Sequence, residues 1–389
     1  MTSAVIVDAV RTAVASRNGK LRDWHPVDLA AEILRDLLER NRLDPVLVED
    51  VILGCLTQIG EQGMNVARNA VLAAGFPDSV PGTTVDRQCG SSQQAIHFAA
   101  QGVLAGAYDV VVAGGVESMT RVSVGSTIVS GPGKPFGPRM TQRYQPAGGL
   151  VPQGPAAELV AARYGLSRDV LDEYSLESHL RAARSAQERR FDGQIVPVTV
   201  EGRRGKQQFR ADEGIRGHAT LAQLTDLKPT FQPDGVITAG NAAPMGDGAA
   251  AVLVMSESRA AALEVPVRAR FVAFAVAGVD PLLMLTGPIP ATSRVLERAG
   301  LTLDDIDRFE VHESFAAVVL AWAQEHDVDL DRVNVNGGAI ALGHPVGASG
   351  ARMLATLLAE LERAGGRYGL QVMCEGGGMA NATIIERLG

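Results

Sequence analysis

The feature that most constrains the fold is an internal duplication. The segment "LLERNRLDPVLVEDVIL" (Leu37–Leu53) aligns without a gap with "VLERAGLTLDDIDRFEV" (Val295–Val311), 258 residues further along the chain. Each copy contains a helix end, a turn, a short acidic segment and a strand. Further on, "TTVDRQCGSSQQAIHFAAQGVLAGAYDVVVAGGVES" corresponds to "VNVNGGAIALGHPVGASGARMLATLLAELERAGGRYGLQVMCEGGG", with a few extra residues in the second turn. Such a repeat predicts two similar halves related by pseudo-twofold symmetry.

Within the first half, strand-like and helix-like patterns alternate. The runs "SAVIVDAV", "EDVILGCL" and "YDVVVAGGVES" have the composition of strands, and amphipathic helical segments separate them. The strands are apolar on both faces, which is typical of a sheet that helices cover on both sides. We therefore expect an α/β fold.

The alternation breaks near residue 121 and resumes near residue 239. The intervening segment begins with a Gly/Pro-rich stretch and continues into the helical stretch "SRDVLDEYSLESHLRAARSAQER". The chain of 389 residues is also too long for one simple core. We predict an N-terminal half over 1–120, completed by about 239–257, an inserted loop domain over 121–238, and a C-terminal half over 258–389.

Charge and hydropathy exclude several classes of partner. A net charge of −8 argues against nucleic acid. The apolar runs are far shorter than the roughly 20 residues of a membrane span, and no secretory signal pattern opens the sequence, so we expect a cytoplasmic protein. Residues 121–234 nevertheless carry 16 Lys and Arg against 12 Asp and Glu. This basic segment is either a solvated surface or a binding site for a small polyanion.

The three cysteines are widely spaced and form no CxxC pair, so neither a disulfide framework nor a zinc site is predicted. Cys55 is assigned to the core. Cys89 lies where a strand-like run ends and a helix-like run begins, next to Gly90 and two serines. Free N–H groups at a helix start favour a thiolate, whereas a free Cys is also a common packed core residue. The local pattern leaves both interpretations open.

The duplication brings a second residue to Cys89. His344, in "ALGHPVGASGAR", occupies the turn equivalent to that of Cys89. Taken alone, a His in a Gly/Pro turn is more often a surface or capping residue. Equivalent turns of two repeated halves tend to meet at their interface, so we expect the two side chains to lie close together. A nearby base is what a thiol needs to become a nucleophile.

Two further segments combine strand ends with polar or reactive residues. "QVMCEGGGMA" ends a strand with Cys374, which is either a core residue or a second reactive thiol. The glycines that follow it, Gly376 first, allow a ligand to approach backbone N–H groups, as an oxyanion hole requires. In "FEVHESFAAVVL", His312 is placed to orient a water, and a helix N-cap is the simpler role for Ser314.

Seven motifs in order give the chain a family resemblance. Together "DRQCGSSQQAIH", "GGVESM", "TAGNAAPMGDGAAAVL", "GVDPLLMLTGPIPAT", "HESFAA", "NVNGGAIALGHPVGASGAR" and "CEGGG" resemble the thiolases over essentially the whole chain. The resemblance implies two βαβαβαββ halves in a five-layer α/β/α/β/α core, with an inserted loop domain that covers coenzyme A. It also implies a homodimer or homotetramer and allows for a partner subunit carrying hydratase and dehydrogenase activities.

The resemblance assigns roles residue by residue. It implies that Cys89 is the nucleophile that becomes acylated, His344 its activating base, and Cys374 the acid and base acting on the acetyl-CoA carbanion. It implies one oxyanion hole from the backbone N–H groups of Cys89 and Gly376, and another from His344 and a water held by His312. It further implies CoA contacts at three residues, namely Arg216, Phe315 and Met284. Coenzyme A is then a substrate, with no permanently bound cofactor and no metal.

These observations predict a degradative 3-ketoacyl-CoA thiolase with a ping-pong mechanism. Gln153, in "VPQGPAAE", stands where thiolases frequently have the Met that lines a short-chain acyl pocket, which predicts a longer or bulkier acyl group. The nearest alternative is a biosynthetic acetoacetyl-CoA thiolase. From a different class, the alternative is a non-catalytic acyl-CoA or lipid-binding protein on the same fold, which would not need Cys89, His344 and Cys374 together.

Overall fold

The computed structural model of the chain describes residues 3–129, 133–202 and 205–389. Residues 130–132 and 203–204 of the predicted insert lie outside the described residues. The strands are β1 (Ala4–Thr12), β2 (Ala15–Ser16), β3 (Asp50–Gly54), β4 (Thr83–Val85), β5 (Val110–Ser118), β6 (Ile195–Val196), β7 (Val198–Gly202), β8 (Gly205–Phe209), β9 (Gly246–Ser256), β10 (Ala269–Gly278), β11 (Arg308–Val311), β12 (Tyr368–Glu375) and β13 (Met379–Arg387).

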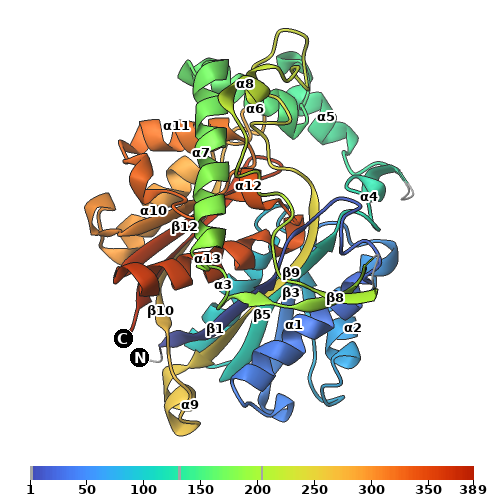
Figure 1. Ribbon diagram of the computed structural model, residues 1–389, viewed down its shortest axis with the longest axis vertical. Coiled ribbons are helices and arrows are strands. Elements are labelled where there is room, and N and C mark those ends of the chain that lie inside the picture. Colours follow the sequence, from blue (N-terminus) through green and yellow to red (C-terminus); the bar gives the residue numbers. More distant parts are fainter. Residues whose placement is uncertain (1–2, 130–132, 203–204) are drawn as a thin grey trace.

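The helices are distributed through both halves and the insert (Figure 1). They are α1 (Pro26–Arg40), α2 (Val66–Ala73), α3 (Ser91–Leu104), α4 (Ser126–Val129), α5 (Pro138–Tyr144), α6 (Gln153–Tyr164), α7 (Arg168–Gln187), α8 (Leu221–Thr225), α9 (Glu257–Ala262), α10 (Pro288–Ala299), α11 (Ala316–His326), α12 (Ala339–Leu342) and α13 (Ser349–Ala364).

The order of strands carries the duplication. The sheet has the strand order β11-β12-β13-β10-β1-β9-β5-β3-β4. The pattern of parallel and antiparallel neighbours is the same on both sides of the β10–β1 junction. On one side β1 and β9 are antiparallel, β9 and β5 antiparallel, and β5 and β3 parallel. On the other side β10-β13, β13-β12 and β12-β11 repeat that pattern. The outermost strand, β4, has its counterpart in an isolated bridge between Phe309 and Val333.

The 258-residue offset holds at the level of single elements. Strand β3 begins at Asp50 and β11 at Arg308, and a short 3₁₀ turn precedes each, at Pro45–Leu47 and Leu303–Asp305. Helices α3 and α13 begin at Ser91 and Ser349, at the same offset. The predicted repeat of the fold is therefore confirmed, and it extends to the helices that follow Cys89 and His344.

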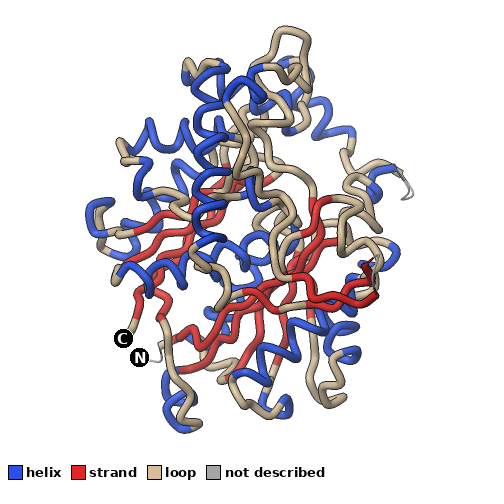
Figure 2. The backbone as a smooth tube through the Cα atoms, in the orientation of Figure 1, coloured by secondary structure: helices blue, strands red, loops and turns tan. Residues whose placement is uncertain are grey.

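Five layers result from this arrangement, as predicted. Helices α3 and α13 pack against each other in the middle, α3 on β3 and β5 and α13 on β11 and β12. Helices α1 and α2 cover the outer face of the N-terminal strands, and α10 covers that of the C-terminal strands with α11 beside it. Figure 2 shows the strands as two groups that nearly separate. Among the described strands, they join where Val5 pairs with Arg270 and Ile6 with Ala269.

Burial explains the apolar composition of the central strands and helices. Strands β5 and β9 are buried at every residue because helices cover both faces, which accounts for their unbroken apolar runs. Helix α13 buries Leu354, Leu357, Leu358 and Leu361 in the middle layer. Each buried leucine contributes roughly 1.5–3 kcal/mol through removal of apolar surface from water.

The insert packs against both halves. Strand β6 pairs with β1 at Arg11 and Thr12, and the buried Arg11 guanidinium binds Asp212 at 2.7 Å. Helix α7 packs on α11 and α12 of the C-terminal half and runs as a long helix along the face in Figure 1. The domain boundaries near residues 121 and 238 remain a prediction.

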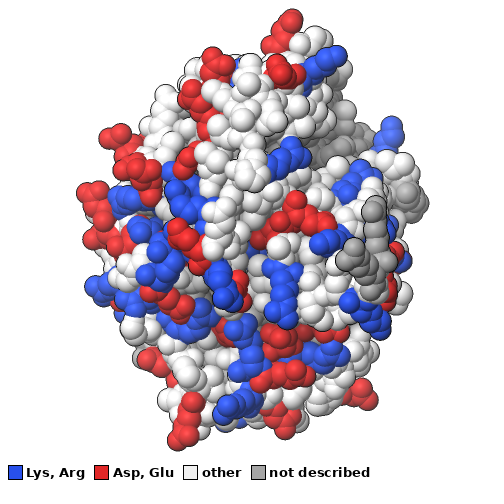
Figure 3. Space-filling view, viewed as in Figure 1, with Lys and Arg blue, Asp and Glu red and all other residues white. Residues whose placement is uncertain are grey.

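Two surface properties bear on possible partners. On the face drawn in Figure 3, basic and acidic side chains are interspersed. Across the described parts of the chain, no helix is both long enough and apolar enough to cross a lipid bilayer.

Candidate active site

The site is built where two helices of the middle layer cross at their N-terminal ends. The Ala351 N–H donates to Ser92 Oγ at 3.0 Å, which ties α13 to α3. Gly350 allows this approach, because a Cβ atom there would lie 2.5 Å from the Gln93 nitrogen. The turns that precede the two helices therefore meet, and these turns carry Cys89 and His344.

We expect the Gly350→Ala variant to lose about 1–3 kcal/mol in free energy of unfolding, because the added methyl group forces the helices apart. Denaturant unfolding measures this loss. Gly193→Ala is the matched control, because a Cβ atom at Gly193 meets nothing within 4 Å. Equal unfolding midpoints for the two variants would show that the helix contact is not tight.

Cys89 occupies the turn between β4 and α3. Gln88 before it has φ 51°, in the left-handed region, and this turns the chain so that the Cys89 sulfur is presented at the start of the helix. Gly90 after it occupies the cap position of α3, where any Cβ would collide with the Glu375 carboxylate. The sulfur accepts a hydrogen bond from Gln153 Nε2 at 3.7 Å.

Burial controls the charge of this thiol. It raises the pKa of Cys89 to about 11, although the Gln153 amide and the backbone N–H groups of Gly376 and Cys89 lower the pKa in part. The helix start therefore does not make Cys89 a resting thiolate. Desolvation of a small buried anion outweighs the helix N-terminus, so the resting group is a neutral thiol.

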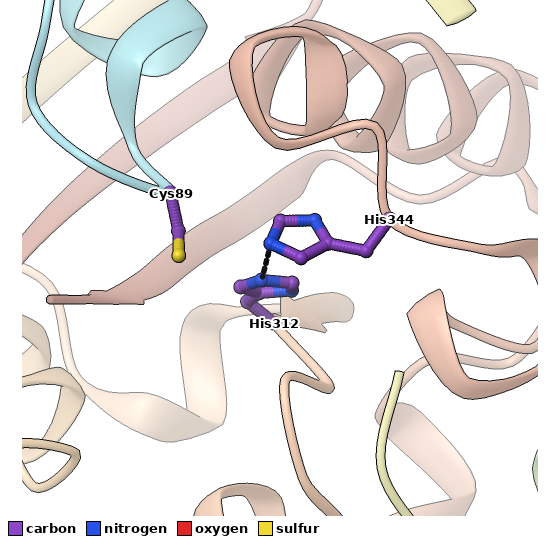
Figure 4. Close-up of side chains that lie close together, drawn as sticks. All are labelled: Cys89, His312 and His344. Atoms are coloured by element: carbon purple, nitrogen blue, oxygen red, sulfur yellow. Dashed lines mark hydrogen bonds between the residues drawn. The ribbon is translucent and has the colours of Figure 1, made fainter. Parts of the chain in front are cut away.

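Cys89, His312 and His344 form one cluster, which confirms the expected proximity of the two turns. The Cys89 sulfur and one ring nitrogen of each histidine all lie within 4.8 Å of one another. Figure 4 shows the two imidazoles side by side with the sulfur facing the same space. The Nε2 atoms of His312 and His344 are 3.3 Å apart. His312 therefore contacts His344 directly.

The hydrogen bonds of Ser349 assign the tautomer of His344. Ser349 Oγ donates to the Pro345 carbonyl at 3.0 Å, so it accepts from His344 Nδ1 at 2.6 Å. His344 then carries its proton on Nδ1 and presents the Nε2 lone pair to the cluster. Burial lowers the pKa of His344 to about 3 and also holds the pKa of His312 well below its usual value. Both rings are neutral at pH 7, so Nε2 of His344 is free to accept a proton.

Cys374 ends β12 and faces the loop that carries His312. Its sulfur lies 3.0 Å from Ser314 Oγ. Burial raises the pKa of Cys374 above its ordinary value, and the nearby Cys89 raises it further. Of the roles considered for Ser314, the helix cap is not observed, because the cap position of α11 is Phe315. The Ser314 hydroxyl instead contacts the Cys374 thiol.

Gly376 lies against the Cys89 sulfur through its backbone. The backbone N–H groups of Gly376 and Cys89 lie near the Cys89 sulfur and lower the pKa of that thiol. A Cβ atom at Gly376 would lie 2.9 Å from Gln88 Oε1, so a larger residue there would displace the Gln88 side chain. Two convergent N–H donors are the arrangement that stabilises a developing oxyanion.

A buried carboxylate that the sequence pattern did not single out fixes the His312 loop. Glu313 accepts hydrogen bonds from Tyr174 and Ser178 of α7, from Asn334, and from the Ile340 N–H. Tyr174 and Ser178 are four residues apart on one helix face, and this spacing was the available signal. The insert thus positions a loop of the C-terminal half.

A second buried carboxylate fixes the turn that follows His344. Glu117 accepts hydrogen bonds from the N–H groups of Leu56, Thr57 and Gly347 and from Gln62 Nε2. It ties the "GHPVG" turn to the N-terminal half. No sequence pattern pointed to this role, because its four donors come from three separate segments.

A cavity of about 580 Å³ lies beside the cluster. Gln88, the residue before Cys89, and Gly376, whose N–H lies near the Cys89 sulfur, line one side of it. Its other walls are mostly apolar and include Leu56, Val124, Ile128, Phe136, Met140 and Met284. The volume falls in the range of pockets that hold a whole small molecule.

The three residues expected to contact CoA occupy different positions. Met284 lines the cavity. Phe315 is buried at the start of α11 in the same apolar cluster as Cys374, and its ring packs edge-on to Phe231. Arg216 is exposed in the loop before α8, and its N–H donates to His179 Nδ1.

Comparisons with known proteins agree with this architecture. The chain is 48% identical over 396 residues to the steroid 3-ketoacyl-CoA thiolase FadA6 of Mycobacterium tuberculosis, covering 100% of this chain and 95% of the relative. It is 44% identical over 405 residues to the 3-oxoadipyl-CoA/3-oxo-5,6-dehydrosuberyl-CoA thiolase of Escherichia coli, covering 100% of both. The solved structure of the Bacillus anthracis acetyl-CoA acetyltransferase superposes with a TM-score of 0.90 at 39% identity, over 100% of this chain and 99% of that one.

Family matches cover nearly the whole chain in two parts. Residues 4–258 match the family described as "Thiolase, N-terminal domain", and residues 265–387 match "Thiolase, C-terminal domain". The chain therefore belongs to the thiolase family.

Proposed function

We propose that the protein is a degradative 3-ketoacyl-CoA thiolase, which cleaves a 3-ketoacyl-CoA with CoA into acetyl-CoA and a shortened acyl-CoA. The observation that carries the proposal is the convergence of the Cys89 thiol with the Nε2 atom of His344 beside paired backbone N–H donors. A nucleophile, a base and an oxyanion site are the three components that acyl transfer requires.

In the first half-reaction, His344 Nε2 releases its contact with His312 and takes the proton of Cys89 as the sulfur attacks the C3 carbonyl. Because both groups are neutral at rest, proton transfer accompanies attack and does not precede it. The N–H groups of Cys89 and Gly376 stabilise the oxyanion at C3. The C2–C3 bond then breaks, leaving the acyl group on Cys89 and a carbanion at C2 of acetyl-CoA.

Cys374 gives its proton to the C2 carbanion, which completes acetyl-CoA. In the second half-reaction, the Cys374 thiolate takes the proton of an incoming CoA thiol. The CoA sulfur attacks the acyl group on Cys89 and forms the shortened acyl-CoA. The Cys89 sulfur that leaves takes back the proton held on His344, so every group returns to its starting state.

We assign His312 to the oxyanion of the acetyl-CoA enolate. The resemblance to thiolases implied a water between the HESF histidine and the site. With its Nε2 atom 3.3 Å from that of His344, the ring itself is placed to donate a hydrogen bond together with protonated His344. In this arrangement, two imidazole N–H groups stabilise the negative charge at the enolate oxygen.

We also propose how CoA is bound, where the protein acts and how it assembles. We assign the insert over 121–238 as the domain that covers CoA. Arg216, Phe315 and Met284 are the proposed CoA contacts. CoA is a substrate, and the mechanism uses no permanently bound cofactor or metal. We further propose a cytoplasmic homodimer or homotetramer, which a hydratase and dehydrogenase subunit can join. The sequence resemblance supports these assignments.

Acyl specificity is the part of the function that the cavity addresses most directly. We expect acetoacetyl-CoA to be a poorer substrate than longer or bulkier 3-ketoacyl-CoA esters, because a cavity of about 580 Å³ leaves a two-carbon acyl group without contacts over most of its walls. Gln153 next to the sulfur and the relatives named for steroid and 3-oxoadipyl substrates support the same expectation. Comparing kcat/KM for thiolysis across chain lengths and ring-containing acyl groups tests it.

A cavity variant makes the test specific. Val124 lines the cavity at an exposed position, so Val124→Trp fills space at small cost to stability. It is expected to lower kcat/KM for the bulky esters by more than it does for acetoacetyl-CoA. A preference of the wild type for acetoacetyl-CoA would favour the biosynthetic alternative. Absence of thiolysis with every ester would instead favour a non-catalytic carrier.

A further inference from the structure

We propose that Cys89, His312 and His344 also form a binding site for a divalent transition metal of the Zn²⁺ type, and that the bound metal reversibly blocks the enzyme. The metal would act at the proposed active site, so the inhibitory consequence rests on the proposed function. Binding itself does not depend on that function. The proposal starts from the chemistry of the three donors, one sulfur and two imidazole nitrogens, which is a donor set that Zn²⁺ prefers.

The spacing of the donors fits a four-coordinate ion. Zinc–nitrogen bonds of about 2.0–2.1 Å in a tetrahedron place two ligand nitrogens about 3.4 Å apart. The Nε2 atoms of His312 and His344 are 3.3 Å apart, so they already have this separation. The Cys89 sulfur lies within 4.8 Å of both nitrogens, so a small side-chain rotation brings it to bonding distance.

The surroundings of the two rings support ligation. His344 donates its Nδ1 proton to Ser349 Oγ, which is the outer hydrogen bond that orients metal-ligating histidines. His312 Nδ1 is buried and meets no hydrogen-bond partner among the described residues. No hydrogen bond on that side of the His312 ring opposes a slight rotation of the ring toward a shared ion.

Three protein ligands leave the fourth position of the ion for water or for the CoA thiol. Cys89 and His344 are buried, with residue exposures of 4% and 8%, and the neighbouring cavity is the route by which an ion can reach the cluster. On binding, the Cys89 thiol loses its proton to solvent and its sulfur bonds to the metal, while the His312 proton moves from Nε2, where it bonds His344, to Nδ1. The same sulfur can then no longer attack a 3-ketoacyl-CoA, and removal of the ion by a chelator restores it.

Co²⁺ titration of the purified protein, without any CoA substrate, tests the site. One Co²⁺ per chain is expected, with the sulfur-to-metal charge-transfer absorption of a bound thiolate and the intense visible bands of four-coordinate cobalt. Competition with Zn²⁺ should abolish these bands. Cys89→Ser is expected to lose the charge-transfer band. His312→Asn is expected to weaken binding by at least about tenfold, since even outer-shell changes cost 10–100-fold.

Control variants separate this site from adventitious binding. His326→Asn and Cys55→Ser change a histidine and a cysteine outside the cluster and should leave the titration unchanged. Binding without a thiolate band, or equal binding by His312→Asn and the wild type, would overturn the proposal. Because the readout is spectroscopic, the site can be refuted while thiolysis is intact. Equally, a missing thiolysis activity leaves the metal test interpretable.

Discussion

Acetyl-CoA is expected to transfer one acetyl group to the wild-type protein, on the peptide that contains Cys89, and Cys89→Ser should lower kcat for thiolysis by about 10⁴ or more. A serine hydroxyl is a far weaker nucleophile in the same buried turn, and no other described side chain lies where the sulfur meets both His344 and the Gly376 N–H. Mass spectrometry of the digested protein locates the acetyl group, and a CoA-release assay gives kcat.

Cys55→Ser is the matched control for this experiment. Cys55 is buried in the core of the N-terminal half and lies 4.0 Å from Glu117, outside the cluster. The variant should retain acetylation at Cys89. Acetylation on another peptide, or on none, would remove Cys89 from the role of nucleophile. A fully active Cys89→Ser protein would have the same consequence.

Cys374→Ser should separate the two halves of the reaction. We expect it to reduce steady-state thiolysis by about 10²–10⁴-fold, the usual range for removal of a general acid or base. Serine is nearly the size of cysteine and keeps a partner in Ser314, so the fold should be preserved. Acylation of Cys89 by acetyl-CoA should largely persist, because His344 takes the Cys89 proton and the CoA thiolate is a good enough leaving group to depart without the Cys374 proton.

Two measurements on one preparation decide this prediction. Steady-state thiolysis reports the whole cycle, and the stoichiometry of acetyl-Cys89 reports the acylation step alone. Normal turnover by Cys374→Ser would exclude Cys374 from proton transfer. Loss of both readouts with an unchanged unfolding midpoint would mean that the departing CoA needs the Cys374 proton during acylation, contrary to the expected separation of the two steps.

Much of the architecture was predictable because the two copies of the duplication share the same local sequence patterns. The alignment of Leu37–Leu53 with Val295–Val311 predicted equivalent helix ends, turns and strands, and the 3₁₀ turns before β3 and β11 occur at that offset. Repetition also predicted that the turns of Cys89 and His344 meet. That inference needed no side-chain detail, because symmetry alone brings equivalent turns to a shared interface.

Two points that the local pattern left open are decided by groups from distant segments. The start of α3 favours a thiolate at Cys89, yet burial by residues from other segments raises its pKa to about 11. Ser314 has the residue type of an N-cap, but its hydroxyl contacts Cys374, sixty residues away. In both cases the local preference is worth about a kcal/mol or less, and the competing tertiary term is larger.

The sequence by itself determined the repeated α/β halves, the family and the identity of the cluster residues, since these follow from residue order and short-range pattern. Only the tertiary structure decided the protonation states and the direct contact of His312 with His344. It also decided the hydrogen bonds that Tyr174 and Ser178 of the insert donate to Glu313. Desolvation and contact depend on which distant segments surround a group. The order of residues along the chain does not specify that environment until the chain has packed.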